Sequence, residues 1–110
     1  MVTQAQPEVV RTIRELVRSP DKVSFTSKAI WDTKAHGLTR ADVCEAIGDW
    51  IDTGKQVQVL IATEDPDHVG EPTYVLKPIF RNGKFYVKVS ITVDEKTGEA
   101  LLIVSCHPSR

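Results

Sequence analysis

The sequence lacks the features that mark several large classes of protein. It has only two cysteines, Cys44 and Cys106, which are too few for a disulfide framework and lack the spacing of metal ligands. No apolar run is long enough to span a bilayer, and residues 1–7 contain no apolar signal-peptide core. We therefore expect a cytoplasmic protein with no membrane association, in which each cysteine is a small buried apolar residue.

The common catalytic motifs are missing as well. The sequence contains no glycine-rich phosphate loop, no HExxH, no GxSxG and no paired CxxC. The acidic residues between positions 64 and 67 do not follow the pattern of a calcium loop. We therefore predict neither a metal nor a cofactor, and any catalysis must use tyrosine, lysine, histidine and hydroxyl groups.

The chain has little net charge. It contains 14 basic and 15 acidic residues, which gives a net charge of −1 at pH 7. A protein that relies on non-specific affinity for nucleic acid is usually basic, so any such role here must rest on a local patch. With 110 residues, of which 41% are hydrophobic and 26% charged, we expect a single globular domain that covers 1–110.

The first half of the sequence predicts helices. Pro7 suits the first position of a helix, and Thr26 can cap a second one. Thr39 with Asp42 predicts a capping box at the start of a third. The expected order is a flexible tail at 1–6, a helical part at 7–54 and a sheet at 55–107.

The second half predicts antiparallel strands. Asn82-Gly83 lies between two β-rich runs and is a strong hairpin signal, because both residues tolerate positive φ. Apolar and polar residues then alternate, which predicts a core face with Phe85, Val87, Val89, Ile91 and Val93 and a polar face with Tyr86, Lys88, Ser90 and Thr92. Helices followed by strands indicate an α+β fold, with N-terminal helices packed on a mostly antiparallel C-terminal sheet.

The predicted polar face is basic. Between Thr73 and Ile91 the sequence has no acidic residue, and its basic residues are Lys77, Arg81, Lys84 and Lys88. One interpretation is a solvated sheet face, on which lysines keep the edges soluble. The other is a surface for an anion, most plausibly a phosphate backbone.

Three segments of the chain, in order, carry a resemblance to a known family. The first comprises Phe25-Thr26-Ser27-Lys28-Ala29, His36-Gly37-Leu38 and Asp42-Val43-Cys44-Glu45-Ala46-Ile47; the second is Tyr74-Val75-Leu76-Lys77-Pro78; the third comprises Gly83-Lys84-Phe85-Tyr86-Val87-Lys88-Val89 and Leu102-Ile103-Val104-Ser105-Cys106-His107. In this order and spacing they resemble motifs of the MqsR-type toxins of bacterial toxin–antitoxin pairs, over roughly residues 8–107.

This resemblance implies a RelE-like fold and the toxin of a type II toxin–antitoxin pair. Such a toxin is a metal-independent endoribonuclease that cleaves mRNA, arrests translation and is neutralised by a cognate antitoxin protein. The family's catalytic tyrosine falls on Tyr86, its C-terminal lysine on His107, and its glutamine near Thr73. Its central lysine has no clean match in this sequence, and the nearest lysine is Lys55.

These considerations define the candidate site. The catalytic candidates are Tyr86, His107, Lys88, Lys55 and His68, the last of which is the loop histidine suited to proton transfer near neutral pH. The candidates for RNA binding are Lys77, Arg81, Lys84 and Thr73. An antiparallel register places His107 beside Tyr86, give or take two residues. The alternative hypothesis is a catalytically silent binding protein of the same fold, which holds a partner protein or a nucleic acid.

Overall fold

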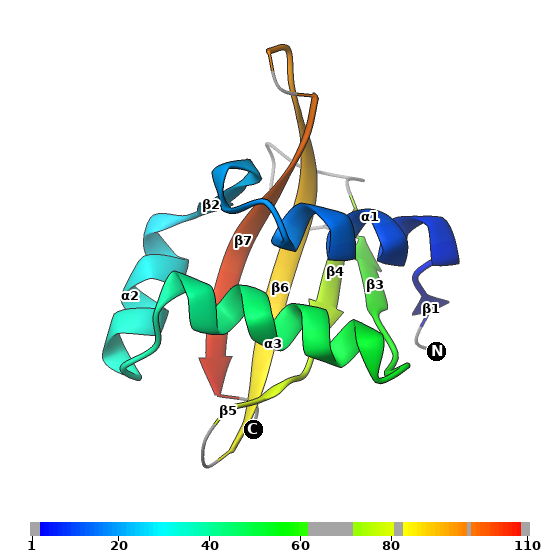
Figure 1. Cartoon of the computed structure of the whole chain (residues 1–110). Helices are drawn as coiled ribbons and strands as arrows, with labels where there is room; N and C mark the ends of the chain where they lie inside the picture. Colours follow the sequence, from blue (N-terminus) through cyan, green and yellow to red (C-terminus); the bar gives the residue numbers. More distant parts are fainter. Residues whose placement is uncertain (1–2, 62–71, 81–82, 97, 109–110) are drawn as a thin grey trace.

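The computed structural model describes residues 3–61, 72–80, 83–96 and 98–108. Its helices are α1 (Pro7–Val17), α2 (Ser27–Ala35) and α3 (Arg40–Asp52), with a 3₁₀ turn η1 (Pro20–Lys22) after α1 (Figure 1). Its strands are β1 (Thr3–Gln4), β2 (Val23–Phe25), β3 (Gln58–Ile61), β4 (Pro72–Leu76), β5 (Ile79–Phe80), β6 (Gly83–Asp94) and β7 (Gly98–Pro108). The expected α+β fold class is confirmed.

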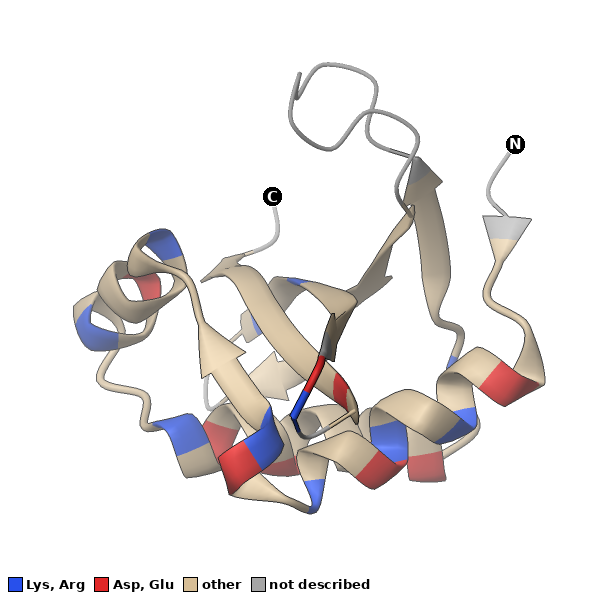
Figure 2. Ribbon diagram, turned by 90° about the horizontal axis from the view of Figure 1, so that it is seen from above, with Lys and Arg blue, Asp and Glu red and all other residues tan. Residues whose placement is uncertain are grey.

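The strands follow the order β1-β3-β4-β6-β7-β2, and β5 pairs with β6 beside this path. Every described pair is antiparallel except β2 with β7, which confirms a mostly antiparallel sheet. Helices α1 and α3 lie across one face of the sheet, while α2 stands apart from them beside β7 (Figures 1 and 2). Within the described ranges, no helix has both the length and the apolar character needed to cross a membrane.

Local side-chain signals set the helix ends. The Thr39 hydroxyl accepts from the N–H of Asp42, and the Asp42 carboxylate accepts from the N–H of Thr39, which forms the predicted capping box. Thr26 caps α2 by accepting the N–H of Ala29. Just past α2, Gly37 has a φ of 67°, in the left-handed region that glycine adopts without a Cβ clash. The predicted starts of both helices are therefore confirmed.

The N-terminal segment differs from the flexible tail that the sequence suggested. Thr3 and Gln4 form β1 opposite Val59 and Gln58. The pairing continues past the strand, since Ala5 donates its N–H to a carbonyl of the segment before β3. Backbone hydrogen bonds alone can hold an edge strand, and a strand of two residues is too short to show a side-chain pattern. The sequence therefore could not reveal β1.

A second unpredicted strand lies inside the part expected to be helical. Strand β2 runs parallel to β7, with its three residues opposite residues 101–103. The N–H of Thr26 extends this ladder by donating to the carbonyl of Ile103. Three residues are too few to show an alternation, so the sequence pattern could not separate β2 from a loop.

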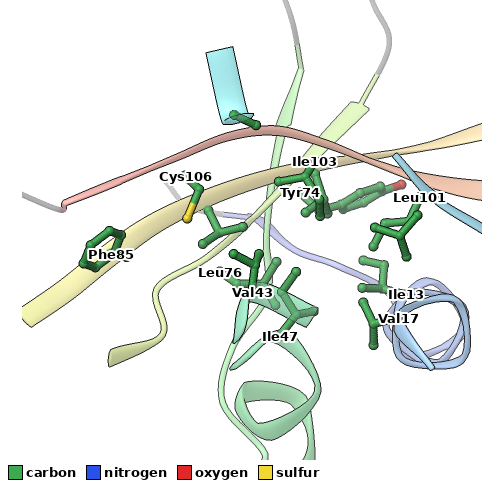
Figure 3. Close-up of a cluster of buried hydrophobic side chains, with 14 of the residues drawn as sticks. Ile13, Val17, Val43, Ile47, Tyr74, Leu76, Phe85, Leu101, Ile103 and Cys106 are labelled. Atoms are coloured by element: carbon green, nitrogen blue, oxygen red, sulfur yellow. The ribbon is translucent and has the colours of Figure 1, made fainter. Parts of the chain in front are cut away.

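The core lies between the sheet and the pair of helices α1 and α3 (Figure 3). On β6 the predicted inward residues Phe85, Val87 and Val89 are buried. They pack with Ile13, Leu16 and Val17 of α1 and with Val43 and Ile47 of α3, while Val9, Trp50 and Ile91 lie partly buried at the margins. The predicted core face is confirmed except at Val93, which is 81% exposed because the β6–β7 hairpin extends beyond the helices (Figure 1).

A β-bulge interrupts the ladder between β6 and β7. On one side of it Val89 pairs with Ile103, and on the other side Lys88 pairs with Ser105. Val104 is the extra residue and has no partner on β6. Because side chains alternate along a strand, this insertion exchanges the faces to which the rest of β7 points.

The side chains of Thr26, which caps α2, and of Asp32 in α2 bond the edge of β7 at and beyond the bulge. Strand β2 pairs with β7 only as far as Ile103. Past that residue, the Thr26 hydroxyl donates to the carbonyl of Val104 at 2.7 Å, and the N–H of Cys106 donates to Asp32 Oδ2 at 3.2 Å. Thr26 and Asp32 thus replace a neighbouring strand as partners of the β7 backbone.

The thiol of Cys106 leads to a prediction about pH. Its side chain is fully buried, and this burial, together with the nearby carboxylate of Asp32, raises its pKa from 9.0 to about 11. The thiol of the unfolded chain therefore ionises first as the pH rises, so stability that is present below pH 9 is lost between pH 9 and about 11. We expect the free energy of unfolding to fall by about 2–3 kcal/mol over this range.

Urea unfolding at about pH 8 and about pH 11 measures this loss. The variant Cys106→Ala should show a flatter pH dependence than the parent, whatever its own stability at pH 8. The variant Cys44→Ala is the comparison: burial raises the pKa of this half-buried thiol as well, but the cation of Arg40 opposes the shift, so its removal should flatten the pH dependence less than Cys106→Ala does. Equal pH dependence in the parent and in Cys106→Ala would show that the Cys106 thiol does not ionise as expected.

Candidate functional site

The face of the sheet that points away from α1 and α3 carries mainly polar side chains. We call it the open face; it consists of the residues that alternate with core positions on β4, β6 and β7. Its members include Thr73, Val75, Lys84, Tyr86, Lys88, Ser90, Thr92, Leu102, Ser105 and His107, with Lys77 directly after β4. Of the described strand positions on this face, only Asp94, at the hairpin end of β6, holds an acidic residue. Helix α2 flanks the face at the β7 edge (Figure 2).

Tyr86 and His107 are direct partners across β6 and β7 on the open face. Their rings stack, with centroids 5.3 Å apart and planes inclined by 11°. The Nδ1 atom of His107 lies 3.1 Å from the carbonyl oxygen of Pro108. A proton on Nδ1 is donated to that oxygen, which leaves Nε2 as a hydrogen-bond acceptor. The pair then presents a phenol hydroxyl and an accepting imidazole nitrogen at one place.

The phenol of Tyr86 is a donor at neutral pH. Its side chain is half-buried, and this burial raises the pKa of the phenol above its ordinary value of 10.0. The neutral hydroxyl therefore predominates, and no phenolate is available to attack a substrate. What Tyr86 can supply is a hydrogen bond or a proton.

Lys88 occupies the next open-face position of β6. It lies between Val75 of β4 and Ser105 of β7 in a single row across the sheet. Among the residues that the structure describes, Lys88 forms no ion pair. An ammonium group that lies near the Tyr86 and His107 pair and faces no acidic strand residue can bind a phosphate.

The open face brings together many of the residues predicted from the sequence. It holds Tyr86, His107, Lys88, Lys77 and Thr73, and the expected placement of His107 beside Tyr86 is confirmed. The Thr73 hydroxyl donates to a carbonyl of β3 at 3.3 Å. Lys84 lies farther along β6, where it pairs with a residue of β5.

Lys55 does not belong to this group. It follows α3, and its Nζ lies 5.3 Å from the centroid of the Trp50 ring, on the helix side of the sheet. This cation–π contact orients the ammonium toward α3. The sheet separates Lys55 from Tyr86, so the structure gives no support to a shared catalytic role. His68 and Arg81, also predicted, lie outside the described residues.

Two polar residues on this face were not singled out from the sequence. Ser105 stands opposite Lys88, and Gln58 of β3 stands opposite Val75, so both lie in the same row as Lys88. The position of Ser105 depends on the bulge, for which the sequence has no signal. The position of Gln58 follows from its alternation with the apolar residues on either side, and this pattern could have revealed it.

In the part of the chain that the structure describes, no group of three or more His, Cys, Asp and Glu side chains is placed to hold a metal ion. No protein-family model matches this chain, and no similar curated protein or solved structure was found. The chemistry of the open face is therefore the basis on which a function can be proposed.

Proposed function

We propose that this protein is a metal-independent endoribonuclease, the toxin of a type II toxin–antitoxin pair with a RelE-like and MqsR-like fold. Its substrate is cytoplasmic mRNA, and its protein partner is a cognate antitoxin. The observation that carries the proposal is the stacked pair of Tyr86 and His107 beside Lys88, on a part of the face where no described strand position holds an acid between Lys84 and Thr92 of β6. The motifs that resemble MqsR-type toxins support the same function.

His107 and Tyr86 supply the two proton transfers that the reaction needs. Nε2 of His107 takes the proton of a ribose 2′-hydroxyl, and the 2′-oxygen attacks the adjacent phosphorus. The bond from phosphorus to the 5′-oxygen breaks as Tyr86 donates its proton to that oxygen. The products are a 2′,3′-cyclic phosphate and a 5′-hydroxyl end.

The basic residues of the open face bind the phosphates. Lys88, next to the pair along β6, stabilises the negative charge that develops on the phosphorane oxygens. Thr73 lies in β4, the strand next to β6, and Lys77 directly follows it. Both contact the RNA backbone before or after the cleaved bond. Such phosphate contacts hold the strand in place without reading its sequence.

One observation favours the alternative, a catalytically silent RNA-binding or protein-binding module of the same fold. The strand β3, where the resembling toxins carry a central lysine, has Gln58 on the open face and no lysine. Lys55, the nearest lysine in the sequence, lies on the helix side of the sheet. The alternative keeps the phosphate contacts and loses the cleavage.

Incubation of the purified protein with RNA in the presence of EDTA distinguishes the two functions. A toxin ribonuclease produces new 5′-hydroxyl ends, which end mapping detects, and its induction in a bacterial host arrests growth. RNA binding without new ends supports the silent module. If the protein neither binds nor cleaves RNA at low salt, the ribonuclease and the RNA-binding module are both rejected, and only the protein-binding module remains.

The basic residues of the open face lead to a further prediction. If Lys88 contacts a phosphate, the affinity for single-stranded RNA falls as salt rises, because bound counterions are released on binding. The variant Lys88→Gln should bind more weakly at low salt and reduce the slope of log K against log salt by about 0.7. Fluorescence anisotropy with a labelled single-stranded RNA at several salt concentrations measures both quantities.

The matched control is Arg11→Gln, which removes an exposed cation from α1 on the other side of the sheet. This variant should leave the slope unchanged. An equal loss of slope in Lys88→Gln and Arg11→Gln would mean that the affinity is a general effect of charge. An unchanged slope in Lys88→Gln would remove this lysine from the RNA-binding surface.

A further inference from the structure

An open groove lies between α3 and β5, on the helix side of the sheet. Its volume is about 340 Å³, and its apolar lining consists of Leu38, Ala46, Trp50, Pro78, Ile79 and Phe80. Ile79 is 64% exposed, although it is a large apolar residue next to other apolar side chains. Exposed apolar surface of this kind, when polar residues border it, is typical of an interaction site.

Acidic side chains border the groove along α3. Asp42, Glu45 and Asp49 are spaced by three and four residues, which places them on one side of the helix. Asp42 is already engaged in the capping box. Neither Glu45 nor Asp49 forms an ion pair within the described part of the chain.

Glu45 and Asp49 do not stabilise the helix that carries them. Like charges four residues apart on a helix repel each other. Asp49 also lies in the last turn of α3, where the helix dipole disfavours a negative charge. Among the described residues that line the groove, Lys55 is the one cation, and it lies over the Trp50 ring. The apolar lining thus has an excess of negative charge along one border, and no described residue forms an ion pair with Glu45 or Asp49.

We propose that this groove binds a basic, amphipathic segment of a partner protein. Apolar side chains of the segment pack over Ile79 and Trp50, and its lysines or arginines lie opposite Glu45 and Asp49. The complementarity of charge selects this occupant. A nucleic acid is excluded from the groove by repulsion between its phosphates and the carboxylates of α3.

The α3 border of the groove and the pair of Tyr86 and His107 belong to different sides of the sheet, while Ile79 pairs with Lys84 near the end of β6. The groove is lined by α3, which covers the core face, whereas Tyr86 and Lys88 lie on the face opposite. A segment bound along α3 therefore does not cover Tyr86 or Lys88. The proposal does not depend on ribonuclease activity and can be tested without RNA.

The test uses a fluorescein-labelled helical peptide of about 18 residues, made of leucine and lysine in an amphipathic pattern. A second peptide has glutamate in place of every lysine. Anisotropy should show saturable binding of the lysine peptide and none of the glutamate peptide. The double variant Glu45→Gln/Asp49→Asn and the single variant Ile79→Ser should each weaken binding by about tenfold or more.

Two controls match these variants. Glu15→Gln/Asp21→Asn removes two exposed acids away from the groove, and Val93→Ser removes an exposed apolar side chain from the β6–β7 hairpin. Both should bind the lysine peptide as the parent does. Light scattering of the parent and of Ile79→Ser reports whether the chain associates with itself.

Several results would overturn the proposal. Equal binding of the two peptides would remove the role of charge, and unchanged binding by Ile79→Ser or by the double acidic variant would place the peptide elsewhere. A dimer of the parent that Ile79→Ser abolishes would identify a second copy of this chain as the occupant. Absence of any binding by the lysine peptide would leave the groove without the proposed partner.

Discussion

The variant His107→Ala is expected to lose RNA cleavage by a factor of about 10²–10⁴ while it keeps its fold. In the proposed reaction, this residue takes the proton of the 2′-hydroxyl, and an alanine has no group that can accept it. The side chain lies on the open face and makes no contact with the apolar core cluster, so its removal costs little packing. Cleavage rates at saturating RNA and the thermal midpoint are the two measurements.

The variant Tyr86→Phe should have a loss of similar size for a different reason. Phenylalanine keeps the ring that stacks on His107, and only the hydroxyl that donates the proton is removed. RNA affinity should therefore remain close to that of the parent, while the rate of cleavage falls. This separation of affinity from rate distinguishes a proton donor from a residue that only binds the RNA.

The control for both variants is Thr92→Ala, on the same face of β6 but nearer the end of the hairpin. It should cleave RNA as the parent does. If His107→Ala and Tyr86→Phe also cleave like the parent, the site of the chemistry lies elsewhere in the molecule. If the parent itself cleaves no RNA, the proposed ribonuclease activity is absent and these two variants do not test it.

The variant Val89→Asp is expected to prevent folding of the domain. Val89 is fully buried in the middle of β6, between β4 and β7. The change removes apolar burial worth about 1.5–3 kcal/mol and adds an unpaired carboxylate to an apolar core, so the total loss should be about 4 kcal/mol or more. A loss of this size is comparable to the whole stability of a small domain, which is roughly 5–15 kcal/mol.

The chain itself offers the matched control, Val93→Asp. This residue has the same type and the same predicted face of β6, but it is 81% exposed. Its free energy of unfolding should change by no more than about 0.5 kcal/mol. Urea unfolding followed by circular dichroism compares the two variants, and equal behaviour of both would show that the core face of β6 has been assigned incorrectly.

Much of the local structure could be predicted because its causes lie within a few residues. Thr39 and Asp42 bond each other's backbone N–H groups, and Thr26 bonds the N–H three residues later. The alternation along β6 likewise follows from the pleat of a strand and the burial of one face. Two open-face residues of β6, Tyr86 and Lys88, could be placed together for this reason.

Other features depended on contacts between distant segments. The alternation extends through Val93, yet the helices do not reach that far, and this residue is exposed. Lys55 was a catalytic candidate because it was the nearest lysine in the sequence, but Trp50 holds it on the helix side. The strands β1 and β2 form only because β3 and β7 offer them a backbone edge.

The sequence by itself determined the fold class, the helix caps and the face of β6 that carries Tyr86. It placed His107 close to Tyr86, but with an uncertainty of two residues, which left open the face on which the imidazole lies. At the far end of the hairpin, Asp94 pairs with Gly98, and without an insertion this register would bring Cys106 opposite Tyr86.

Only the tertiary structure decided that His107 takes this position. The bulge at Val104 adds one residue to β7, which turns Cys106 into the core and His107 onto the open face. Thr26 and Asp32 bond the β7 backbone at and beyond this point, where β2 has ended. Because these partners lie more than 70 residues away in the sequence, no local pattern in β7 could reveal the bulge.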